Sequence, residues 1–131
     1  LIAMLALTAI MTSCTKYEEG SKFTFLTAKM RMVGEWTVTN ITYDNNDVTS
    51  SYPDISISIK DDQTYSLKWN YGAFSLTETG AWAFNADKTT FITTSSNNVV
   101  TERTILMLKN KMVKLKELDG NGLSTVWTLE Q

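Results

Sequence analysis

The stretch ISISIKDDQTYSLKW, residues 55–69, alternates apolar and polar side chains on both sides of a pair of aspartates. A period of two places one set of side chains on a buried face of a β-strand and the other set on a wet face. Aspartates bond their own backbone and tolerate turn geometry, so the pair fits a tight connection. The stretch therefore predicts two neighbouring strands, each with one buried face. Its apolar set is Ile55, Ile57, Ile59, Tyr65, Leu67 and Trp69.

Similar β-rich segments follow one another from residue 33 onward, separated by short turns rich in Asn, Asp, Gly and Ser. The expected strands are 33–43, 55–60, 63–69, 74–84, 89–95, 99–109, 112–118 and 123–130. In 99–109 both parities carry apolar residues, which indicates a β-bulge. The sizeable loop is 44–54, and apolar spacing over 23–32 favours a short N-terminal helical segment.

Eight strands with tight connections predict an all-β fold, namely an eight-stranded antiparallel up-and-down β-barrel. Closing the meander into a barrel removes its exposed edges. We expect one barrel domain over residues 23–131, because no gap in the pattern indicates a second domain.

The composition excludes several classes of function. The chain has 131 residues, 43% of them hydrophobic, and a net charge of −2, whereas a nucleic-acid partner needs a concentrated basic face. It contains no histidine and one cysteine, which removes the commonest general base and the usual zinc and iron–sulfur ligands. We therefore expect a protein that is not an enzyme and has no catalytic residues, no metal, no cofactor and no nucleic-acid partner. We also expect a monomer.

The first eleven residues, LIAMLALTAIM, form an apolar run. As a helix they would span about 16 Å, while the hydrocarbon core of a bilayer is about 30 Å thick. This length is typical of the h-region of a signal peptide. We expect residues 1–13 to be a signal peptide that lacks its basic start.

The run ends in MTSC, which resembles the lipoprotein box of bacteria. The resemblance implies that the Cys14 thiol is acylated and that cleavage before it makes Cys14 the first mature residue. Several acyl chains on one residue would anchor the protein stably to a membrane. The alternative is a buried or incidental cysteine.

Residues 14–22 would then be a lipidated tether. Its acidic pair, Glu18 and Glu19, either resembles the surface-export signal of lipoproteins in the Bacteroidota or belongs to an ordinary solvated linker. The expected location is the bacterial cell envelope, with the protein lipid-anchored in the outer membrane on its periplasmic or surface face.

Gly34-Glu35-Trp36, at the start of the first strand, resembles the G-x-W signature of lipocalins. The order of elements over residues 30–131 is similar to the lipocalin-like domains of Bacteroidota lipoproteins. The resemblance implies a barrel that binds small apolar molecules and whose floor is closed by Gly34 and Trp36. Classical members place an arginine from the last strand over the tryptophan. Here 123–130 has no arginine, and the candidates are Arg31 and Arg103.

Aromatic side chains on the strands either line a ligand cavity or fill a solid core, because an eight-stranded barrel is wide enough for either. The candidates for lining a cavity are Tyr65, Trp69, Trp82, Phe84, Phe91 and Trp127. Two functions stay open. One is a non-catalytic module that binds a small apolar or amphipathic ligand. The other is a structural or interaction module with a solid core, docking on an envelope complex through its surface or the 44–54 loop.

Charged residues give weaker indications. Arg103, Glu102 and Glu78 either form a polar group inside the barrel or, as the default, are surface charges. Four lysines between residues 109 and 116 either meet anionic headgroups or polysaccharide, or belong to a solvated strand face that protects an edge. These are Lys109, Lys111, Lys114 and Lys116.

Overall fold

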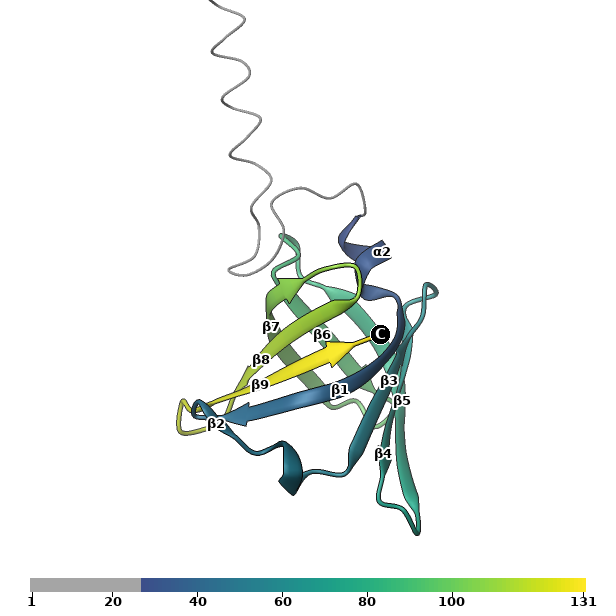
Figure 1. Ribbon diagram of the computed structural model, residues 1–131. Coiled ribbons are helices and arrows are strands. Elements are labelled where there is room, and N and C mark those ends of the chain that lie inside the picture. Colours follow the sequence, from purple (N-terminus) through teal and green to yellow (C-terminus); the bar gives the residue numbers. More distant parts are fainter. Residues whose placement is uncertain (1–26) are drawn as a thin grey trace, which may run out of the picture.

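Eight antiparallel strands follow one another around a closed barrel (Figure 1). The structure, a computed structural model, describes residues 27–131. The strands of the barrel are β1 (Gly34–Tyr43), β3 (Asp54–Ile59), β4 (Thr64–Asn70), β5 (Ser75–Phe84), β6 (Thr90–Ser95), β7 (Val100–Leu108), β8 (Met112–Leu118) and β9 (Ser124–Glu130). Each pairs with its neighbour in the chain, and β1 pairs with β9 to close the barrel. The predicted fold class is confirmed, and the strand bounds agree to within one residue.

The 44–54 segment is more ordered than the loop expected from the sequence. Asp44 and Asn45 have φ values of 50° and 66°, a conformation that these residue types tolerate well. They allow the chain to turn back, so that β2 (Asn46–Asp47) pairs with the end of β1. A single 3-10 turn, η1 (Thr49–Ser51), then leads into β3.

The bulge predicted for 99–109 is present. The register between β7 and β8 shifts between Ile105 and Met107, and four successive residues of β7 from Ile105 to Leu108 are buried. A second shift lies in β1, between Val38 and Asn40. Bulges of this kind bend a strand and increase its twist, which helps a sheet to close.

The lysines of 109–116 do not protect an edge, because β8 is paired with both β7 and β9 and the barrel has no free edge there. Lys109 and Lys111 are exposed in the turn before β8. Lys114 and Lys116 alternate with the buried Val113 and Leu115, which places them on the outer face. That part of the prediction, a solvated strand face, agrees with the structure.

The short helix α2 (Ala28–Met32) covers one end of the barrel (Figure 1). The Thr27 side chain caps the helix by accepting a hydrogen bond from the Met30 backbone N–H. Ala28 and Met32 are buried in the core, so the helix covers the interior at this end. Residues before 27 lie outside the described part of the chain. Among the predictions, these residues include the signal peptide 1–13, Cys14, the 14–22 tether with Glu18 and Glu19, and the first part of the helical segment.

Trp36 fills the barrel directly below α2. Its ring is 1% exposed, and its Nε1 donates a hydrogen bond of 2.8 Å to the Met32 carbonyl oxygen. Arg31, one of the two arginines considered for this end, reaches across to β7 and donates from Nη1 to the Leu108 carbonyl oxygen at 2.6 Å. Gly34 precedes the tryptophan with φ +152°, a conformation that side-chain-bearing residues rarely adopt.

The packed core is concentrated near this covered end. Its largest fully buried side chains are Trp36, Phe91, Met32, Ile59, Leu108 and Val113, while Ile41 is equally buried but lies outside this cluster. Gly80 allows β5 to approach β6 closely there, since a Cβ at this position would lie 2.1 Å from the Thr94 carbonyl oxygen and 2.9 Å from the Tyr65 ring.

Candidate functional site

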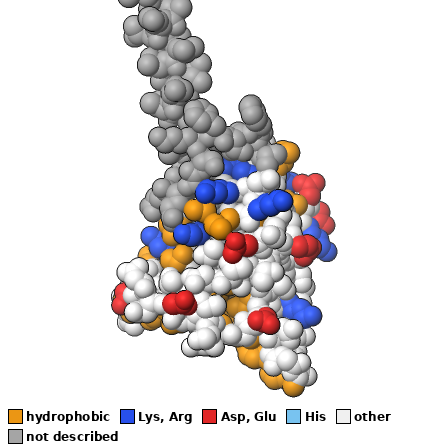
Figure 2. All heavy atoms as spheres, viewed as in Figure 1, with side chains coloured by type: hydrophobic (Ala, Val, Ile, Leu, Met, Phe, Trp, Pro, Cys, Tyr) orange, Lys and Arg blue, Asp and Glu red, His pale blue; other side chains and the backbone are white. Residues whose placement is uncertain are grey.

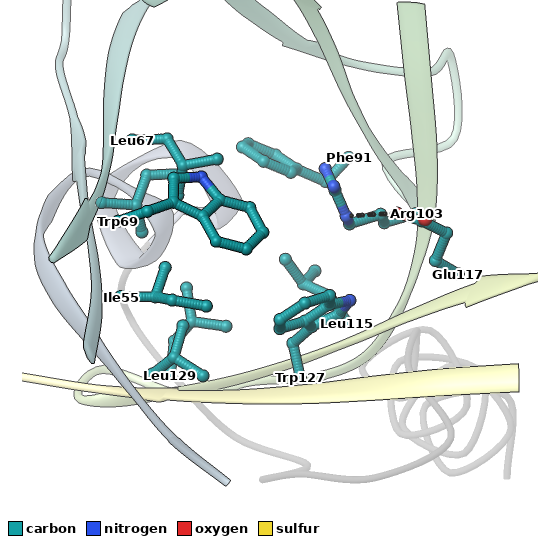
Figure 3. A pocket seen from close by; sticks show the side chains of 11 residues that line it. Ile55, Leu67, Trp69, Phe91, Arg103, Leu115, Glu117, Trp127 and Leu129 are labelled. Atoms are coloured by element: carbon teal, nitrogen blue, oxygen red, sulfur yellow. Dashed lines mark ion pairs between the residues drawn. The ribbon is translucent and has the colours of Figure 1, made fainter. Parts of the chain in front are cut away.

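A cavity of about 260 Å³ occupies the barrel interior beyond the packed core, toward the end away from α2 (Figure 3). Nine of the eleven residues that line it are apolar, and the other two are Arg103 and Glu117. Trp69 and Trp127 are only half-buried, so the cavity is open at this end. The apolar lining consists of Val38, Ile55, Ile57, Leu67, Trp69, Phe91, Leu115, Trp127 and Leu129.

Strand alternation explains why these side chains share the interior. Ile55 pairs with Trp69 and Ile57 with Leu67 across β3 and β4. Paired residues of antiparallel strands lie on the same face. The stretch 55–69 therefore supplies one wall of the cavity. The residues of this wall are those that the period of two predicted to lie on a buried face.

The opposite wall comes from the C-terminal strands. Leu115 pairs with Trp127 across β8 and β9, and Leu129 stands two positions further along the same face. In Figure 3 the rings of Trp69, Phe91 and Trp127 approach one space from three different strands.

The six aromatic candidates divide into two groups, those that line the cavity and those that do not. Trp69, Phe91 and Trp127 line the cavity, whereas Tyr65, Trp82 and Phe84 do not. The latter three face inward nearer the covered end. There the Trp82 ring packs against Phe84 and Phe91 at centroid distances of 5.4 and 5.8 Å. Its Nε1 donates to the Lys60 carbonyl oxygen at 2.9 Å.

Arg103 and Glu117 form an ion pair in the cavity wall, with 2.9 Å between Nε and Oε1. Their side chains are 22% and 38% exposed. The default expectation that Arg103 is a surface charge is therefore wrong. Its expected neighbour Glu102 is exposed, because successive residues of a strand point to opposite faces. The partner comes instead from β8, which no sequence pattern indicated.

Two polar atoms at this wall are buried and have no hydrogen-bond partner among the described residues. They are Trp127 Nε1 and Glu117 Oε1, the latter meeting only the Arg103 guanidinium, as an ion pair. Buried polar groups are normally hydrogen-bonded, so two such atoms in one wall call for an explanation.

Tyr65 and Glu78 form a second polar contact inside the barrel. The Tyr65 hydroxyl donates to Glu78 Oε2 at 2.6 Å. Burial, together with the Glu78 carboxylate, raises the pKa of Tyr65 to about 12. The hydroxyl therefore stays protonated near neutral pH and remains a donor. Glu78, by default expected to be a surface charge, is exposed, but its carboxylate turns inward to this partner.

The 44–54 segment places Tyr52 against the cavity wall. The Tyr52 and Trp127 rings meet edge-on, with centroids 5.6 Å apart. Thr49 fixes the segment, because its hydroxyl accepts from the Ile41 backbone N–H at 2.9 Å and donates to Asp47 at 2.6 Å. No pattern in the sequence indicated that Tyr52 belongs to the site.

Exposed apolar side chains gather at the tip of the β4–β5 hairpin, seen at the lower end of the molecule in Figure 2. Tyr71, Phe74 and Leu76 are 45%, 58% and 55% exposed, and the first two rings stack with centroids 4.9 Å apart. No helix within residues 27–131 has the length and apolar character needed to cross a bilayer. In the same range, no cluster of three or more potential His, Cys, Asp or Glu ligands could hold a metal ion.

Comparisons with known proteins agree with this architecture. A solved structure described as a redesigned beta barrel is similar over 83% of this chain and 98% of that chain, with a TM-score of 0.51 and 13% sequence identity. That similarity concerns the fold alone. No curated protein matches the chain. The family model of the lipocalin-like domain matches residues 32–115, and this family consists typically of non-enzymatic binding proteins. The chain belongs to the lipocalin-like domain family, and its barrel suggests ligand binding.

Proposed function

We propose that this protein is a non-catalytic binding protein that holds a small apolar or amphipathic ligand in its barrel. The observation that carries the proposal is the cavity of about 260 Å³, lined by nine apolar residues and one ion pair. Ligand sites are typically concave and mostly apolar, with a few polar groups that fix orientation. A cavity of 150 Å³ already accepts benzene, so this one has room for a ligand of one or two rings.

The cavity is preformed, which favours binding because little has to be ordered when the ligand enters. The packed core beneath it, with Trp36 and Phe91 each 1% exposed, gives it a firm floor. Tyr52 holds one side of the Trp127 ring in place.

The test is titration of the purified protein with naphthalene, followed by the fluorescence of the probe, and native mass spectrometry of the protein isolated from cells. We expect saturable binding with one site per chain. The matched variant is Leu67→Phe, which fills the cavity, with Leu118→Phe on the exposed end of β8 as its control. No saturation by naphthalene and no co-purifying small molecule would contradict the proposal.

We also propose that Cys14 carries the lipid that anchors the protein in the bacterial outer membrane. The support is the apolar run 1–11 followed by MTSC. The chain would be expressed behind a start codon and a basic segment in a bacterial host, and the cells fed an alkyne fatty acid. Label is expected on the parent chain and not on Cys14→Ala, with Ser13→Ala as the control. Equal labelling of Cys14→Ala would refute the anchor.

A second candidate function, docking on an envelope complex, is favoured by one observation. The tip of the β4–β5 hairpin exposes Tyr71, Phe74 and Leu76 together, and exposed apolar clusters often mark interaction sites. Docking through the hairpin surface does not require the solid barrel core that was expected to accompany this function. Cross-linking in membranes should recover a partner with the parent chain and lose it with Phe74→Ser, while Thr77→Ser serves as the control on the same hairpin. Failure to recover any partner would count against it.

A further inference from the structure

One donor and one acceptor in the cavity wall lack a hydrogen-bond partner. The donor is the indole N–H of Trp127. The acceptor is Oε1 of Glu117, which is ion-paired with Arg103 Nε at 2.9 Å but accepts no hydrogen bond within residues 27–131, and both atoms are buried. A buried polar group without a hydrogen-bond partner lowers stability. A ligand that supplies this partner removes the cost, and its affinity rises accordingly.

The two atoms belong to diagonal neighbours on one face of the barrel. Trp127 pairs with Leu115 across β8 and β9, and Glu117 lies two residues further along β8 on the same inner face. Diagonal neighbours of this kind lie within reach of long and aromatic side chains. In Figure 3 the nitrogen of the Trp127 ring lies on the side nearer Glu117. Both atoms therefore belong to one part of the cavity wall.

The charge in the wall is already balanced. Arg103 lies 2.9 Å from Glu117, and no other charged residue lines the cavity. Because the charges of Arg103 and Glu117 compensate each other, a ligand that brings a further charge of either sign would find no free counter-charge in the lining, and burying that charge would be costly. The wall favours a neutral ligand.

The missing partners define the chemistry of that ligand. A hydroxyl group carries one donor and can also accept, whereas a carbonyl only accepts and an ammonium only donates. We infer that the cavity selects a neutral ligand of one or two rings that bears a hydroxyl group. The hydroxyl oxygen accepts from Trp127 Nε1 and its O–H donates to Glu117 Oε1, while the ring body lies among the apolar residues. This inference rests on the proposed function, since it names the ligand class of the same cavity.

Three probes of equal ring size test the inference: naphthalene, 2-naphthol and 2-naphthoate, titrated separately at pH 7 into the purified protein. The naphthol should bind about tenfold more tightly than naphthalene, the result of two net hydrogen bonds. The naphthoate should bind at least about tenfold more weakly than the naphthol, because it brings an unmatched negative charge to Glu117.

Two variants assign the effect to the named atoms. Trp127→Phe keeps an aromatic wall without the donor and should reduce the preference for naphthol over naphthalene to about threefold. Glu117→Gln leaves the Arg103 charge unpaired and should reverse the order, so that naphthoate becomes the tightest of the three. Glu102→Gln, on the outer face beside Arg103, should leave the order unchanged. Circular dichroism checks that each variant folds. If only one of Trp127→Phe and Glu117→Gln folds, that variant is sufficient to test the inference.

The outcomes separate this inference from the proposed function. Equal binding of naphthalene and naphthol would overturn the inference and leave the apolar cavity as a binding site, with water serving the two wall atoms. Tightest binding of naphthoate by the parent protein would also overturn it. Binding of none of the three probes would overturn both proposals.

Discussion

The two ends of the barrel use the same alternating strands for different purposes. Near α2 the inward side chains are Trp36, Trp82 and the neighbours that bury them, and the helix closes the interior above them. At the other end the inward positions include Trp69, Trp127 and an ion pair, and a cavity remains. Within residues 27–131, no α-helix covers that end. The alternating strands alone enclose an apolar interior. The elements at each end of the barrel decide whether side chains fill that interior.

The largest expected effect contrasts one tryptophan from each end. Trp36→Ala removes a ring that is 1% exposed and its hydrogen bond to Met32, and should lower the free energy of unfolding by about 3–5 kcal/mol. Trp127→Ala, which trims a half-buried cavity wall, should cost about 1–2 kcal/mol. Urea denaturation of both variants measures the difference. Equal costs would mean that the two ends are packed alike.

A smaller effect concerns the close approach of β5 and β6. Gly80→Ala forces a methyl group against the Thr94 backbone, and overpacking of this kind should cost about 1–3 kcal/mol. Gly120→Ala is the matched control, because a Cβ there meets nothing within 4 Å, and it should change stability by less than about 0.5 kcal/mol. Thermal and urea denaturation compare the two variants. A Gly80→Ala protein as stable as the control would show that the strands separate easily.

Filling the open end should change binding more than stability. Leu67→Phe adds volume where space exists, so the free energy of unfolding should move by less than about 1 kcal/mol. Naphthalene should bind about tenfold more weakly, since the ring now occupies part of its site. Probe titration and urea denaturation give the two quantities. A variant that loses stability and keeps its affinity would indicate that the cavity closes in solution.

The smallest effect is the response to acid, where the two ends should behave alike. Asp62 and Asp87 lie in turns near α2, and Asp119 lies at the open end, where it accepts from the Tyr43 hydroxyl at 2.6 Å. Hydrogen bonds from Thr64, from Thr89 and from Tyr43, respectively, hold the pKa of each carboxyl below its ordinary value of 3.8.

A lowered folded-state pKa means that the carboxylates stabilise the fold above pH 3.8, and that this contribution is lost as pH falls through the folded pKa. The parent should therefore exceed Asp119→Asn in stability at pH 6, and the gap should narrow below pH 3.8. Denaturation at several pH values measures it, with Asp44→Asn as the control. A gap that widens on acidification would contradict the hydrogen-bond assignment.

Much of the fold was predictable because its signals are local. The period of two in 55–69, the turn residues between strands and the mixed parity of 99–109 are all read within a few positions of the chain. The structure confirms the eight strands and the bulge between Ile105 and Met107. The turn at Asp44 and Asn45 was the exception, since nothing in a polar segment says that it will pair back on β1.

The strands, their inner faces and hence the set of aromatic residues that point into the barrel follow from local patterns in the sequence. Which of these aromatic residues line a cavity depends on the folded barrel, because alternation fixes the face of a residue and not its depth in the interior. The folded barrel also joins Arg103 to Glu117 and Tyr52 to Trp127. Those contacts depend on the register between distant strands and on a returning loop, which are set by packing of the whole barrel and not by any short stretch of residues.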